Sequence, residues 1–154
     1  MNAAHWHLVV NHLPIIGGMV TFLVLLYGSI VRNPSIVRLG YMLFVLVAIF
    51  SVIATQTGEG AEEYLKNIKA VDDEQILETH VQAADIANYA MIAVGVVALL
   101  SLFIKRLRTA IYMPWITLVI TVVALLLMAR AGNLGGEIMH KEIRNDQIKI
   151  STFK

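Results

Sequence analysis

The sequence contains no cysteine and little charge, and these two absences exclude several classes of protein. Without cysteine, the chain forms no disulfide, offers no thiolate to zinc or to an iron–sulfur cluster, and cannot hold haem covalently through a CxxCH motif. Charged residues are 15% and hydrophobic residues 58% of the chain, against about 25% and 45–50% in typical soluble domains. The net charge of +1 is too small to indicate a nucleic-acid partner. This composition predicts a membrane protein.

Long apolar runs fill most of the chain. Four of them are residues 8–31, 36–57, 79–104 and 110–131. Each is close to the ~20 residues that a helix needs to cross the hydrocarbon core of a bilayer. Lipid cannot hydrogen-bond bare backbone groups, so each run should be helical. The sequence therefore predicts an all-α fold over one domain, residues 1–154: a four-helix transmembrane bundle built from two helical hairpins.

The loop charges predict the orientation of this bundle. The two short turns carry five basic residues and no acid: Arg32, Arg38, Lys105, Arg106 and Arg108. Residues 58–78 carry seven acids against two lysines. The positive-inside rule makes the short turns cytoplasmic. Both termini, the loop 58–78 and the tail 137–154 are then expected on the periplasmic side of a bacterial inner membrane, in a multi-pass protein whose first helix is not a cleaved signal peptide.

Two segments outside the predicted spans have patterns of their own. In residues 58–78, apolar side chains recur among charges at roughly helical spacing, which predicts one or two short amphipathic helices on the outer surface. Residues 141–154 alternate polar and apolar side chains, and we expect a short extended strand there.

A weak internal repeat relates the two predicted hairpins. His12 opens the first and His80 opens the second, while Gly60-Ala61-Glu62 and Gly135-Gly136-Glu137 close them. Two hairpins with the same orientation would be related by an axis along the membrane normal. The repeat predicts that His12 and His80 lie at equal depth on opposite sides of a central seam.

All five histidines fall on the predicted periplasmic side, and they are the candidate ligands. His12 and His80, at the mouths of two spans, are the predicted ligands of a metal or haem iron, and small residues follow both of them. His5 and His7 flank Trp6, and we expect them to be interfacial. His140 is a candidate in place of one of the two ligands, or a partner of a haem propionate.

Arg130 is the one basic residue near the outer end of a span. A charged side chain in a span normally has a partner. Arg130 is expected to pair with a haem propionate, or else with Asp85 or Glu137.

Two imidazoles on a haem iron would leave no open coordination position, which favours electron transfer over catalysis. We therefore expect one haem b, held by His12 and His80, with a second haem held by His140 and either His5 or His7 as an open alternative. The five histidines with Glu62, Asp85 and Glu137 are also a donor set suited to zinc, copper or iron without haem.

The chain resembles a family of small four-span bacterial membrane proteins, domain-of-unknown-function family 2231, whose members are described as haem-binding. The resemblance covers about residues 5–145. It rests on four features: His12-Leu13-Pro14, Thr57-Gly58, His80, and Gly135-Gly136 followed by His140. It implies a b-type haem and a redox partner. In that family an aromatic residue and a further glycine often follow the Gly-Gly pair, and here Glu137-Ile138-Met139 stands there instead.

These observations predict a membrane-bound b-type cytochrome module near the periplasmic surface rather than a stand-alone enzyme. Its expected partners are the lipid bilayer, a redox protein or larger electron-transfer complex, and a quinone. Two alternatives stay open: a non-haem metal-binding membrane protein, and a structural subunit of a respiratory or photosynthetic complex.

Overall fold

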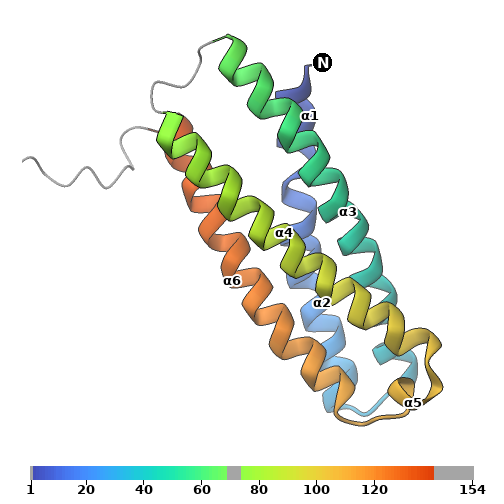
Figure 1. Ribbon diagram of the computed structural model, residues 1–154. Coiled ribbons are helices and arrows are strands. Elements are labelled where there is room, and N and C mark those ends of the chain that lie inside the picture. The colour runs from blue at the N-terminus through green and yellow to red at the C-terminus, as the bar shows by residue number, and fades with distance from the viewer. Residues whose placement is uncertain (1, 69–73, 141–154) are drawn as a thin grey trace, which may run out of the picture.

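The computed structural model describes residues 2–68 and 74–140, and within these residues the chain is all-helical with no strand (Figure 1). The helices are α1 (Ala3–Val10), α2 (His12–Ile30), α3 (Pro34–Asn67), α4 (Glu74–Phe103), α5 (Lys105–Arg108) and α6 (Met113–Met139). Four helical stretches are long and apolar enough to cross a membrane: α1 with α2 (Ala4–Ile30), α3, α4 and α6. The predicted all-α bundle of four membrane helices is confirmed.

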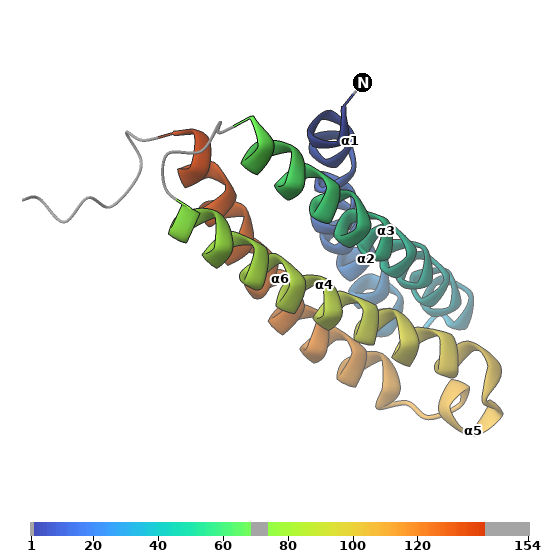
Figure 2. The same ribbon diagram turned by 45° about the horizontal axis from the view of Figure 1, so that its top comes forward.

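The helices form two hairpins that pack side by side (Figures 1 and 2). Helices α1 and α2 pack on α3, α6 packs on α4, and α3 joins the hairpins by packing along α4. Leu25, Phe44 and Met91 are fully buried at the centre. Only about a third of each apolar helix window is buried, from 28% to 39%. The rest faces outward, as expected of a bundle whose surroundings are lipid.

The first membrane helix starts earlier than residue 8 and is interrupted at Asn11. The side chain of Asn2 caps α1 by accepting a hydrogen bond from the backbone N–H of His5 (2.9 Å). Pro14 has no N–H to donate to the carbonyl of Val10, and its ring crowds that carbonyl. The helix therefore breaks into α1 and α2 one turn before the proline.

The sequence predicted separate surface helices within residues 58–78, but residues 58–67 belong to the membrane helix α3. Instead α3 continues without interruption from the apolar span to Asn67. Its apolar side chains keep their helical spacing past Gly58, with Ala61 buried. Lys66 and Glu62, one turn apart, form an ion pair at 2.7 Å. Helix α4 then begins at Glu74 rather than residue 79, and residues 69–73 lie outside the described part of the chain.

Helix α6 runs past the predicted span at its far end. It begins at Met113 rather than residue 110, and it ends at Met139 rather than residue 131. The predicted tail 137–154 therefore starts inside a helix. Residues 141–154, with the expected strand, lie outside the described residues.

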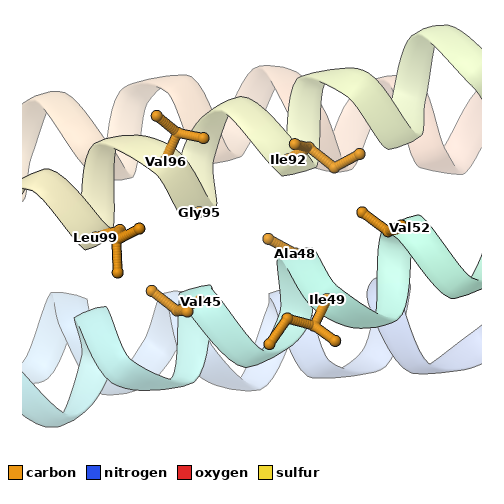
Figure 3. A pocket seen from close by; sticks show the side chains of 8 residues that line it. All are labelled: Val45, Ala48, Ile49, Val52, Ile92, Gly95, Val96 and Leu99. Atoms are coloured by element: carbon orange, nitrogen blue, oxygen red, sulfur yellow. The ribbon is translucent and has the colours of Figure 1, made fainter.

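Helices α3 and α4 approach closely where Ala48 faces Gly95. A Cβ at Gly95 would overlap the Cβ of Ala48 and lie 3.2 Å from the carbonyl oxygen of Phe44. Beside this contact lies an open apolar groove (Figure 3). It is lined by Val45, Ala48, Ile49, Val52, Ile92, Gly95, Val96 and Leu99. The crossing of the two hairpins thus depends on the absence of a side chain at residue 95.

We predict that Gly95→Ala lowers the free energy of unfolding by about 1–3 kcal/mol, because the added methyl overfills this contact. The same substitution at Gly132 is a matched control, since a Cβ there meets nothing within 4 Å. Gly132→Ala should be neutral or stabilise by up to ~1 kcal/mol through helix propensity. Thermal unfolding of both variants in one detergent measures the difference, and equal midpoints would contradict the prediction.

Candidate functional site

The N-terminal helix α1, the last turns of α3 and α6 and the first turns of α4 lie at one end of the bundle (Figures 1 and 2). The two hairpins diverge toward this end in both views. Helix α1 packs mainly on α3. Each hairpin carries one partly buried histidine here, His7 on α1 and His80 on α4.

His80 is held against α6 by a hydrogen bond and a close contact. Its Nδ1 lies 3.0 Å from the carbonyl oxygen of Ala131. A carbonyl can only accept, so Nδ1 carries the proton and donates it. The neutral ring then has an unprotonated Nε2, which is the form that binds a metal. A Cβ at Gly135 would lie 2.9 Å from Cε1 of His80, so only a glycine leaves room for this ring position.

His7 has a similar arrangement against α3. Its Nδ1 lies 3.3 Å from Oγ1 of Thr57. The Thr57 hydroxyl lies closer to the carbonyl of Ile53 (2.9 Å) than to the ring, so we assign its proton to that carbonyl and the proton of the His7–Thr57 hydrogen bond to Nδ1 of His7. This again leaves Nε2 without a proton. A Cβ at Gly58 would lie 3.3 Å from Cε1 of His7.

The two hairpins therefore present their histidines in matching ways. Each ring contacts a glycine of the returning helix of its own hairpin, and each Nδ1 donates to an oxygen of that helix. The hydrogen-bonded residues are 50 apart in the first hairpin and 51 apart in the second. The internal repeat thus relates His7 with Gly58 to His80 with Gly135. The sequence pattern had instead matched His12 to His80.

The ring of His7 also lies near the histidine of the other hairpin. The ring of His7 lies within electrostatic reach of His80 and, to a lesser degree, of His12. One turn after His7, the side-chain oxygen Oδ1 of Asn11 is buried and has no hydrogen-bond partner among the described residues. A buried acceptor without a donor costs about 1–3 kcal/mol. Such an atom often marks a place where a further group binds.

The other predicted site residues lie further from this pair. His12 is exposed, and its Nδ1 donates to the carbonyl of Leu8 on the preceding turn (3.1 Å). His5 is exposed on α1, and His140 is exposed at the end of α6. Arg130 is exposed on α6 and forms no ion pair within the described ranges.

The expected partner of Arg130 is engaged elsewhere. Glu137 accepts a hydrogen bond at 2.7 Å from the side-chain amide of Asn133, one turn before it on α6. Asp85 is partly buried on α4.

The donor set favours a centre with two protein ligands. Among residues 2–68 and 74–140, no three histidine, aspartate or glutamate side chains converge as a metal site. Non-haem zinc sites usually take three or four protein ligands, whereas a haem iron with two axial imidazoles takes two. The groove of Figure 3 contributes no ligand, because its lining is wholly apolar.

Comparisons of the chain with protein-family models, with curated proteins and with solved structures found no match.

We predict that Gly135→Ala displaces the ring of His80 and weakens its hydrogen bond to Ala131, because the new methyl would lie within 3 Å of the ring. In ¹⁵N-histidine-labelled protein, His80 should show the Nδ1–H tautomer, and Gly135→Ala should shift its resonances. Gly132→Ala, on the same helix with open space around its Cβ, should leave them unchanged. An Nε2–H tautomer at His80 in the unsubstituted protein would contradict the assigned hydrogen bond.

Proposed function

We propose that this protein is a membrane-bound electron carrier that holds one b-type haem between the imidazoles of His80 and His7. One observation carries the proposal. Two partly buried histidines from opposite hairpins lie within electrostatic reach of each other, and each uses Nδ1 on its own hairpin, which leaves Nε2 unprotonated. A six-coordinate haem iron takes two imidazole ligands, and this pair supports the proposal by offering one from each hairpin.

We propose His7 rather than His12 as the ligand from the first hairpin because its ring is more buried and is held by contacts with another helix. A ligand works best when its ring is oriented by a second hydrogen bond and by packing. His7 has both, from Thr57 and Gly58 of another helix. His12 is exposed and bonded only within its own helix turn.

The remaining residues would serve the same centre. A bound haem would supply a one-electron couple whose potential depends on ligands, burial and nearby charge. The side chains of Arg130 and His140, both exposed at this end, would face haem propionates at the surface.

Membership of the haem-binding four-span family and the periplasmic location of the site are part of this proposal. The histidine motifs quoted above support the first. The loop charges support the second, because five basic residues lie at the opposite end of the bundle, which the positive-inside rule makes cytoplasmic. Electrons would then pass between a quinone or membrane partner and a carrier on the outer side.

We predict that His80→Ala and His7→Ala each remove most of the haem from protein expressed with ample haem and extracted in mild detergent. Each substitution deletes one of two axial ligands. His5→Ala and His12→Ala are matched controls, because both rings are exposed, and both should retain the content of the unsubstituted protein. Haem content and the low-spin α band measure the outcome.

Two results would change the assignment. If His12→Ala loses haem and His7→Ala does not, the ligand from the first hairpin is His12. If all four variants keep the same haem content, the histidines at this end are not its ligands.

A further inference from the structure

The end of the bundle opposite the histidines is a basic surface, and no acidic side chain of the described residues lies there. Five exposed basic residues lie there: Arg32 and Arg38 around the α2–α3 turn, and Lys105, Arg106 and Arg108 on α5. In Figures 1 and 2, α5 and this turn lie together at the end away from the N-terminus. No acid occurs in residues 1–58 or 86–136. The five charges therefore have no carboxylate near them in sequence, and within residues 2–68 and 74–140 none lies at their end of the bundle.

Arg32 is held in a conformation that glycine normally occupies. Its φ is 53°, and among the described residues other than glycine it is the one with a positive φ. Arg32 directly follows Val31, the C-cap residue of α2. The backbone N–H of Asn33 donates a hydrogen bond to the carbonyl of Gly28 (3.0 Å), and the N–H of Arg32 donates to the carbonyl of Ser29 (3.4 Å). This pattern is a Schellman motif, and its left-handed residue is usually glycine. Keeping an arginine there costs stability, which indicates that its side chain is needed for something else.

Exposed apolar side chains border the basic surface on the membrane side. Phe103 is 78% exposed, Ile111 76%, Tyr112 56% and Trp115 46%. Tyrosine and tryptophan favour the level of lipid headgroups. The basic side chains next to them therefore lie at the level of lipid phosphates rather than out in water.

We propose that this basic surface, Arg32, Arg38, Lys105, Arg106 and Arg108, binds anionic phospholipid headgroups of the membrane that holds the bundle. Each basic residue near an anionic membrane surface strengthens binding about fivefold. Arg32 contributes through a turn position that would otherwise favour glycine. The site does not depend on haem.

The two tryptophans of the chain allow each end to be tested separately. Trp115 borders the basic surface, and Trp6 lies on α1 at the other end; both are about half exposed, at 46% and 52%. A Trp6→Phe protein reports on the basic end, and a Trp115→Phe protein reports on the histidine end. Each is reconstituted in vesicles that contain brominated phosphatidylglycerol or brominated phosphatidylcholine, and fluorescence quenching gives the lipid preference beside each tryptophan.

We expect Trp115 to be quenched preferentially by the brominated phosphatidylglycerol, and Trp6 to show no such preference. In the Trp6→Phe background, Arg32→Gln should lower the preference about fivefold, whereas Arg32→Lys should retain it. Arg130→Gln, at the other end, is the matched control and should leave the lipid preference beside Trp115 unchanged. Arg32→Gly should lower the preference as much as Arg32→Gln does, while its thermal midpoint stays equal or rises, because glycine suits the left-handed position.

Equal quenching of Trp115 by the two lipids would overturn the proposal, as would a preference that Arg32→Gln and Arg32→Gly leave unchanged. Inorganic phosphate distinguishes a lipid site from a free-anion site. If it removes the preference beyond the effect of sodium chloride at the same ionic strength, the surface binds free phosphate, and the lipid assignment is wrong.

Discussion

The hydrophobic effect does not drive helices together inside a bilayer, because lipid chains are as apolar as leucine. Close packing at small residues stabilises their association instead. In this protein the absence of a side chain at Gly95 lets α3 and α4 come together at Ala48. The same constraint operates at the histidine end, where Gly58 and Gly135 leave room for the rings of His7 and His80. Both the fold and the candidate site depend on these contacts.

The histidine site follows from this packing. A ring whose Cε1 edge lies against a glycine is close enough to the facing helix to use its oxygens. His80 finds the carbonyl of Ala131, and His7 finds the hydroxyl of Thr57. Those hydrogen bonds determine which nitrogen carries the proton. In the resulting tautomer Nε2 carries no proton. The packing of the helices therefore determines which ring nitrogen of each histidine could bind a metal.

The two ends of the molecule differ in charge as well as in chemistry. The described acids lie on the histidine side, while five basic residues lie at the other end. Such an asymmetry orients a bundle in the membrane. It also separates the end with the proposed haem site from the end with the proposed lipid site, so each proposal can be tested without disturbing the other.

The sequence was sufficient for the membrane class, the four helices and the location of the histidines at one end. Hydrophobic length and loop charge determine those features directly. The helix ends were harder, because glycines at residues 58, 132 and 135 resemble terminators. In the structure they lie inside continuous helices, and Gly58 and Gly135 are contact points for histidine rings.

The ligand from the first hairpin was also harder to choose. His7 beside Trp6 resembles an interfacial residue, and His12 beside the apolar run resembles a ligand. Only the break at Asn11, caused by Pro14, and the packing of α1 on α3 bring His7 inward and leave His12 exposed. A pattern that could have indicated this is the pair His7 and Asn11, four residues apart on one helix face.

The most direct test of the central claim is a dithionite-reduced minus oxidised visible spectrum of the purified, unsubstituted protein, with a pyridine haemochrome assay for stoichiometry. The account predicts a sharp low-spin α band and one haem per chain, because two imidazoles close both axial positions. Protein made with ample haem that carries none would contradict it.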